Sequence, residues 1–270
     1  MHQRISIGGI CFPGEGAREV TEHLRALRPR RTSLVSPMLF AEGLPALRDL
    51  VDAGDWTLEY LMHPFLAPRQ LSERDAWAGA RAQLDQVIEA VQALGGRSIY
   101  MVTGGRGGLT WEDAAEAFSE AIAPCVARAR DAGVALMIEP ASTVFSDIHI
   151  AHSLRDTVQL AEMAGIGVCL DVFTCWTEAG LQQTIERAVP LCHLIQVADY
   201  VLGDRASPCR AVPGDGAIPL ERILGWALDA GYKGAFDLEL IGPRIDGEGR
   251  EAACRRAGDW IGGFLDRRGG

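Results

Sequence analysis

The sequence lacks three features that would place it in large classes of protein. It has no run approaching the roughly 18 apolar residues of a membrane-spanning helix. It has no CxxC pair, and its seven cysteines lie mostly in apolar stretches, so we expect reduced thiols rather than a disulfide framework. Lysine is almost absent, with Lys233 as the single example, and we give this compositional trait no functional weight.

An excess of basic charge is also absent. The chain has 26 Lys and Arg against 36 Asp and Glu, which gives a net charge of -10. Nucleic acid and anionic membrane surfaces repel such a chain, so we expect a small-molecule substrate as its partner. The first residues contain no long apolar stretch of the secretory kind, which with the free thiols predicts a cytoplasmic location. Assembly into a homo-oligomer is left open.

The sequence does contain a regular alternation of strand-like and amphipathic helix-like segments. The expected strands are 4–10, 31–36, 56–62, 98–103, 134–139, 166–171, 193–199 and 235–240. The expected helices are 17–27, 71–94, 111–132, 153–164, 179–188, 218–230 and 247–266, with a weaker segment at 44–53. Eight such units predict an α/β fold, a single-domain (β/α)8 TIM barrel over 1–270 with a loose tail at 266–270. The competing doubly wound sheet is disfavoured because no GxGxxG follows the first strand.

Polar side chains stand where four consecutive strands of this barrel end. Glu139 and Asp171 close the fifth and sixth strands, Gln196 lies in the seventh, and Glu239 lies in the eighth. Three carboxylates that converge at the catalytic rim of a barrel repel one another unless a cation neutralises them. A side-chain amide oxygen is a neutral metal ligand, so the pattern predicts a divalent metal site. For each residue alone, a solvated loop acid or a hydrogen-bonded core amide is the alternative.

These segments resemble the xylose isomerase-like TIM barrels, also called the sugar phosphate isomerase/epimerase superfamily, which includes inosose isomerases and dehydratases. The resemblance covers nearly the whole chain and rests on "MIEPAS", "VCLDVF", "LIQVAD", "FDLELIG" and "CRAVPGDGAIPL" (209–220). The last segment is similar to the family's R-x-x-P-G-x-G-x-I loop. The resemblance implies one divalent metal ion, Mn2+ or Mg2+ in first place and Co2+ or Zn2+ as alternatives. Its ligands would be Glu139, Asp171, Gln196 and Glu239.

The chain departs from the family pattern at two positions. The ligand from the seventh strand is usually His in the epimerases, whereas Gln196 is similar to the dehydratase-like members. The family often has Asp-x-x-His after the sixth strand, and here Thr174 stands where that His would be.

Further candidates lie in the loops that follow the strands. His63 follows the third strand and is predicted to be a catalytic acid or base, with a turn-capping role as the alternative. His149 and Arg210 are predicted to contact substrate. Phe173 and Trp176 are predicted to line the pocket, which favours a substrate with an apolar portion.

The main functional hypothesis is a metal-dependent isomerase or epimerase of a hydroxy-ketone, such as a ketose or keto-cyclitol. The metal would stabilise an enediolate, and Glu139 and Glu239 would transfer the proton. The alternative is a metal-dependent lyase or dehydratase acting on a keto-polyol or a glycoside-like substrate with an apolar portion. An endonuclease IV-type nuclease is opposed by the acidic charge and by the presence of six histidines in the whole chain. A non-catalytic barrel is the remaining alternative.

Overall fold

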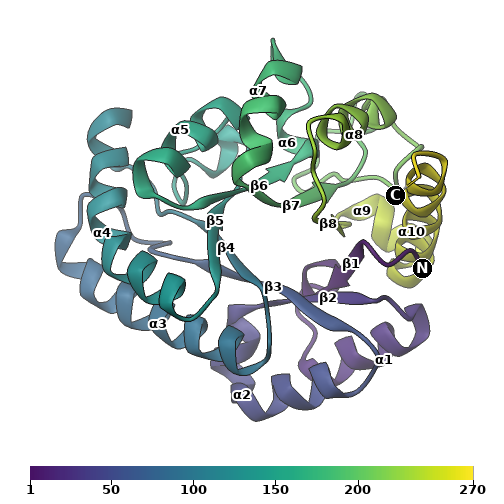
Figure 1. Cartoon of the computed structure of the whole chain (residues 1–270), viewed down its shortest axis with the longest axis horizontal. Coiled ribbons are helices and arrows are strands. Elements are labelled where there is room, and N and C mark those ends of the chain that lie inside the picture. The colour runs from purple at the N-terminus through teal and green to yellow at the C-terminus, as the bar shows by residue number, and fades with distance from the viewer. Residues whose placement is uncertain (270) are drawn as a thin grey trace.

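The computed structural model describes residues 1–269, in which parallel strands close into a barrel in the order β1 to β8. The strands are β1 Ile5–Gly8, β2 Arg31–Val35, β3 Thr57–Pro64, β4 Ser98–Val102, β5 Ala135–Ile138, β6 Gly167–Asp171, β7 Cys192–Val197 and β8 Ala235–Leu238. β1 pairs with β8, which closes the barrel, and Figure 1 shows the strands at the centre with helices around them. The predicted (β/α)8 fold is confirmed.

Most of the helices fall close to the predicted ranges, but the short helices at 172–175 and 243–248 were not predicted, and the helix expected from residue 71 begins at Trp77. The helices are α1 Ala17–Leu27, α2 Ser36–Asp52, α3 Trp77–Ala93, α4 Trp111–Asp131, α5 Leu154–Ala164, α6 Val172–Cys175, α7 Leu181–Ala188, α8 Leu220–Asp229, α9 Pro243–Glu248 and α10 Arg250–Arg267. Thr110 and Ser153 cap α4 and α5 by accepting hydrogen bonds from backbone N–H groups. α2 begins earlier than predicted because Gly43, at φ 83°, interrupts it and breaks the helical periodicity of the sequence.

The predicted loose tail at 266–270 is wrong for its first residues. α10 continues to Arg267, whose guanidinium donates to Glu221, and Arg268 pairs with Asp229 on α8. These ion pairs hold the end of α10 against α8. Gly270 lies outside the described residues.

Side chains from alternate strand positions fill the barrel interior. A buried cluster inside the barrel contains Tyr60, Tyr100, Met137, Cys169, Leu194 and Ala235. Side chains two residues apart share a face of a strand, so the next inward positions on β6 and β7 are Asp171 and Gln196, and the next one along β5 is Glu139, one residue past its end. Strand alternation therefore carries these three residues to the carboxyl end of the barrel.

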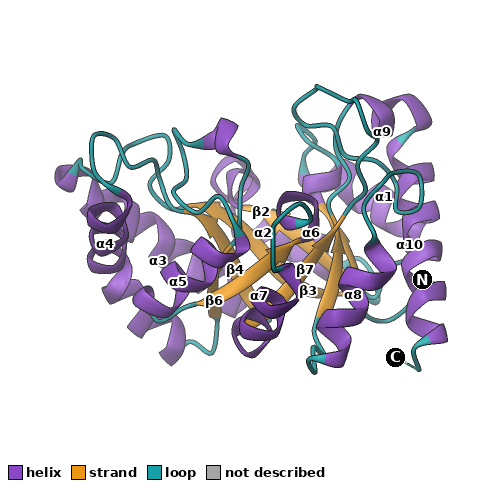
Figure 2. Cartoon of the chain, turned by 90° about the horizontal axis from the view of Figure 1, so that it is seen from above, coloured by secondary structure: helices purple, strands orange, loops and turns teal. Residues whose placement is uncertain are grey.

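Long loops gather at this carboxyl end, where α9 also lies (Figure 2). Among residues 1–269, none of the helices is long and apolar enough to cross a membrane.

Candidate active site

The carboxyl end of the barrel brings three carboxylates together. One oxygen each of Glu139, Asp171 and Glu239 lies within 4.8 Å of the others. Glu139 and Glu239 come one residue after β5 and β8, and Asp171 is the last residue of β6. The three carboxylates repel one another, yet the fold holds them close enough together for one cation to bind all three.

Two of these carboxylates have an unsatisfied oxygen. Glu139 Oε2 and Glu239 Oε2 are buried and accept no hydrogen bond from residues 1–269. Burial raises the pKa of Glu139, and the neighbouring Glu239 and Asp171 carboxylates raise it further. Burial also raises the pKa of Glu239 to about 7, although Arg210 opposes this shift. A divalent cation would satisfy the orphaned oxygens and relieve the repulsion, so the residues fit a metal site.

Gln196 adjoins this cluster through the sheet. It is completely buried and pairs in register with Asp171 on β6 and with Asp237 on β8. Its Oε1 accepts a weak hydrogen bond from the Cys169 thiol at 3.1 Å, and its Nε2 has no partner within residues 1–269. Turning the amide over would point its oxygen where the unpaired nitrogen now lies. A buried amide whose nitrogen has no hydrogen-bond partner within residues 1–269 agrees better with a neutral metal ligand than with a core residue whose hydrogen bonds are all made.

Arg210 is the cation that the structure places in the cluster. It is buried, and its Nη1 and Nη2 donate to Asp171 Oδ1 and Oδ2 at 3.1 and 2.9 Å. Nη2 also lies 3.0 Å from Glu239 Oε1. The guanidinium stacks on the ring of Phe173 at 4.5 Å. The sequence indicated a role in substrate contact and gave no sign of this bridge between two acids.

Asp171 is also held by the start of α6. Its Oδ1 accepts from the backbone N–H of Phe173 at 3.0 Å, and its Oδ2 accepts from the Thr174 hydroxyl at 2.6 Å. Thr174 therefore positions the carboxylate of Asp171.

An aromatic group flanks Arg210. Phe173 and Trp176 are half-buried, and both rings lie near Tyr200, at centroid distances of 6.0 and 6.2 Å. Tyr200 follows β7 and was missed in the sequence, although an aromatic residue after a barrel strand is itself a signal. Of the predicted pair, Phe173 thus lies beside the cluster against Arg210, and both Phe173 and Trp176 have Tyr200 as a neighbour.

His149 lies beneath the rim and is fully buried. Its Nδ1 accepts from the Thr103 backbone N–H at 3.0 Å, and its Nε2 donates to the Glu139 carbonyl at 2.7 Å. Burial lowers its pKa to about 4, so the ring is neutral at pH 7. Because backbone groups occupy both nitrogens, this placement gives the predicted substrate contact no support and makes His149 a brace for the backbone at Glu139.

His63 lies on β3 but on the face away from the barrel interior, because Tyr60 and Met62 occupy the inward positions. Its Nδ1 is 2.9 Å from the Ser36 hydroxyl, and its ring lies 6.2 Å from that of Phe40. Burial lowers its pKa to about 4. The predicted catalytic role gains no support from this position.

Two buried acids near the site were not singled out in the sequence. Asp237 precedes Glu239 by two residues, accepts a hydrogen bond from the Tyr60 hydroxyl at 2.8 Å, and has its pKa raised by burial to about 8. Asp199 accepts backbone hydrogen bonds from Gly214, Gly216 and Ile218. A side chain at Gly216 would collide with Asp199, since its Cβ would lie 2.3 Å from Oδ1. Asp199 thus fixes the loop that carries Arg210.

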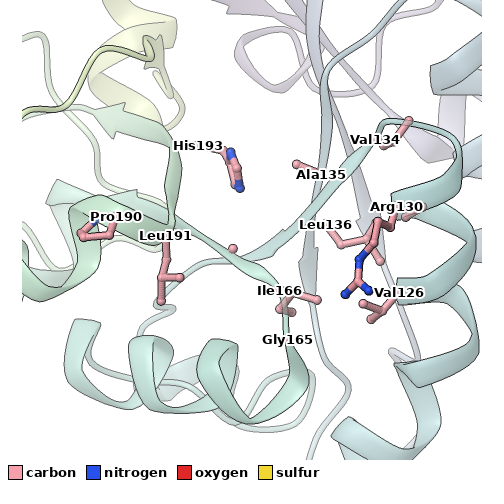
Figure 3. A pocket seen from close by; sticks show the side chains of 12 residues that line it. Val126, Arg130, Val134, Ala135, Leu136, Gly165, Ile166, Pro190, Leu191 and His193 are labelled. Carbon is pink, nitrogen blue, oxygen red and sulfur yellow. The ribbon is translucent and has the colours of Figure 1, made fainter.

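A pocket of about 300 Å³ lies at the opposite end of the barrel, where β5, β6 and β7 begin (Figure 3). Val126 and Arg130 of α4 line one side, and Leu191 and His193 line the other. His193 stands at the start of β7, far along the strand from Gln196. This pocket contains none of the clustered carboxylates.

The fold and the acid cluster define a TIM-barrel protein with a candidate cation site at its catalytic end. The chain belongs to the xylose isomerase-like TIM barrel family, whose sequence model matches residues 24–262. No curated protein matches the chain in sequence.

Several solved structures share this fold. The IolI protein with a bound zinc atom is 13% identical, has a TM-score of 0.82, and the match covers 98% of each chain. An L-ribulose 3-epimerase is 19% identical with a TM-score of 0.80, and the match covers 99% of this chain and 96% of that one. A 3-keto-D-glucoside 4-epimerase from E. coli is 14% identical with a TM-score of 0.76, and the match covers 96% and 99%. Identities this low establish the common fold alone.

Proposed function

We propose that the protein is a divalent-metal-dependent isomerase or epimerase of a hydroxy-ketone, either a ketose or a keto-cyclitol. The observation that carries this proposal is the cluster of Glu139, Asp171 and Glu239 within 4.8 Å, with two buried carboxylate oxygens left without hydrogen bonds among residues 1–269. The zinc in the IolI structure and the two epimerases among the similar structures support it.

Glu139, Asp171, Glu239 and the amide oxygen of Gln196 would hold the metal. When bound there, the ion would polarise a substrate carbonyl and stabilise negative charge that develops on oxygen. Oxygen donors without sulfur favour a hard ion, so Mn2+ or Mg2+ is proposed first and Co2+ or Zn2+ second.

Glu139 and Glu239 would move the proton. A carboxyl with a pKa near 7 exchanges protons readily at neutral pH, and the pKa of Glu239 lies there. One carboxylate would remove the proton from the carbon next to the carbonyl, producing an enediolate. The other would return a proton to the opposite face, or to the neighbouring carbon, which gives epimerisation or isomerisation.

Arg210, Phe173 and Trp176 would contact the substrate. Arg210 offers guanidinium donors beside two of the acids, and the Phe173 ring supplies apolar surface next to it. Trp176 adds a second ring near Tyr200, which Phe173 also adjoins. We assign no proton transfer to His63 and no substrate contact to His149, because of the contacts described above.

A lyase or dehydratase is the second candidate. Its substrate would be a keto-polyol or a glycoside-like substrate with an apolar portion, and the half-buried rings of Phe173 and Trp176, which both lie near Tyr200, favour the apolar portion. The same enediolate would expel a group at the β carbon, so the catalytic residues would be unchanged.

One experiment tests both candidates. Metal-free protein is incubated in D2O with Mn2+ and a panel of ketoses, keto-cyclitols and 3-keto-glycosides, and the products are analysed by mass spectrometry and NMR. An isomerase or epimerase yields a product of the same composition carrying one deuterium. A lyase yields a product that has lost water or a fragment. A Glu59→Gln variant, altered at the other end of the barrel, is the matched control. Protein that binds no divalent metal would contradict the proposal.

A further inference from the structure

Arg210 reaches the acid cluster from a loop whose backbone is fixed. Its N–H donates to the Ile241 carbonyl at 3.2 Å, and the following residues are held by the carboxylate of Asp199. Only the side chain of Arg210 therefore needs to change position for its contacts with the acids to change.

Asp171 has no acceptor position left over in this arrangement. A carboxylate offers about four lone-pair positions, two on each oxygen. Oδ1 accepts from the Phe173 N–H and Arg210 Nη1, and Oδ2 accepts from Thr174 and Arg210 Nη2. Phe173 and Thr174 are fixed by the start of α6, two and three residues after Asp171. The guanidinium is the one of these donors that comes from a distant, separately anchored segment.

We propose that Arg210 is an internal cation that competes with the divalent metal for Asp171. The inference rests on the proposed metal site. A metal that binds through Asp171 has to displace at least one of the two Arg210 hydrogen bonds. The guanidinium keeps its contact with Glu239 Oε1 and its stacking on Phe173, so it stays in the site.

The charges in the site agree with this exchange. With all three carboxylates ionised, the guanidinium leaves a net charge of about -2, which is what one divalent ion neutralises. Arg210 would thus stabilise the cluster before the metal arrives. Its freed donors would then face the substrate once the metal is bound.

The test measures Mn2+ affinity in metal-free protein by titration, with free Mn2+ followed by EPR. Replacing Arg210 by Met should tighten Mn2+ binding by about tenfold or more, because a charge-assisted bidentate contact no longer competes. Arg210→Lys should also tighten binding, by less, because an ammonium lacks the fork that bridges both oxygens of Asp171. Arg31→Met is the matched control, since Arg31 pairs with Glu59 at the other end of the barrel, and it should leave the affinity unchanged.

The possible results distinguish a failure of the Arg210 competition from a failure of the proposed metal site. If the Met variant binds Mn2+ no more tightly than the wild type, the competition is refuted while the metal site stands. If the Met variant tightens but the Lys variant matches the wild type, net charge alone matters and direct occupancy is refuted. If the wild type and every variant bind no metal, the proposed function fails with it.

Two further measurements keep the test independent of folding. Thermal melts of the metal-free forms report whether Arg210→Met folds, and the Lys variant carries the comparison if it does not. In 15N-labelled wild type, Mg2+ should shift the Nε–Hε signal of Arg210, which is assigned by its loss in the Lys variant. An unshifted signal at saturating Mg2+ would refute the exchange.

Discussion

Both ends of the barrel bury carboxylates, but the two ends differ in how many cations pair with these acids. At the amino end, Glu59 is buried but lies within ion-pair distance of both Arg31 and Arg97. At the carboxyl end, one guanidinium, that of Arg210, pairs with Asp171 and Glu239. One buried oxygen each of Glu139 and Glu239 has no partner within residues 1–269. A buried acid with its own cations stabilises a fold. Buried acids that outnumber their cations need another positive group, which is why we place the function at the carboxyl end.

The largest expected effect comes from removing a proton-transferring acid at the carboxyl end. Glu139→Gln and Glu239→Gln each keep an oxygen ligand but lose the base, so turnover should fall by about 10² or more. Metal binding should be partly retained. Glu59→Gln should reduce stability and leave the turnover of folded protein unchanged. Deuterium exchange into a ketose that the wild type converts gives the readout, and near-wild-type turnover in both carboxyl-end variants would reject the assignment.

The pH dependence of metal binding should be the next largest effect. The pKa of Glu239 is raised from 4.5 to about 7, chiefly by burial, and that of Glu139 is raised too. Between these values the folded protein holds protons that the unfolded chain has released, and a metal has to displace them. Mn2+ affinity should therefore rise from about pH 5 to about pH 7, roughly tenfold per pH unit for each proton displaced.

The stability of the metal-free protein should fall as the pH rises, whereas its Mn2+ affinity should rise. A raised carboxyl pKa stabilises the folded state at low pH, and this contribution is lost as pH rises through about 7. Urea unfolding at several pH values measures it. Stability that does not fall as the pH rises through about 7 would contradict this expectation. A metal affinity independent of pH would contradict the preceding one.

The contrast between the two ends also shows what the sequence was able to predict. Strand and helix periodicities are local signals, so the eight strands and the inward positions of Glu139, Asp171 and Gln196 followed from them. The position of Arg210 depends on the path of the loop after β7, which brings its side chain to Asp171, a residue 39 positions away in the sequence. No local pattern encodes that path, and the bidentate contact was not predicted.

The histidines show the same limit. Whether a residue after a strand points into the pocket depends on how its loop folds back. His149 turns inward beneath Glu139, and His63 sits on the helix-facing side of β3. Both look like rim residues in the sequence, because His63 lies near the end of a strand and His149 lies in the loop that follows one, and true rim residues occupy the same kinds of position.

Substitutions of Gln196 should have a smaller effect, which is limited to metal affinity and metal preference. Gln196→Leu should weaken binding of every divalent ion by about tenfold, as expected for one lost contact of about 1.4 kcal/mol, while the barrel stays folded. Gln196→His should still bind metal but shift the preference from Mn2+ toward Zn2+ or Co2+. If the amide serves only the Cys169 thiol, Gln196→Leu will lower thermal stability and leave Mn2+ affinity untouched.

The smallest expected effect concerns Thr174, which contacts Asp171. Its hydroxyl donates to Asp171 Oδ2 at 2.6 Å, whereas Ser98 at the amino end donates to the Glu59 carbonyl at 3.0 Å. Thr174→Val and Ser98→Ala each remove one hydroxyl donor, so each should lower stability by about 1 kcal/mol, or roughly 2–4 °C in Tm for a chain of this size. Turnover should stay within about threefold in both, because the backbone N–H of Phe173 still holds the carboxylate of Asp171. A loss of about 10² in turnover for Thr174→Val, with Ser98→Ala unaffected, would show that the hydroxyl itself takes part in proton transfer.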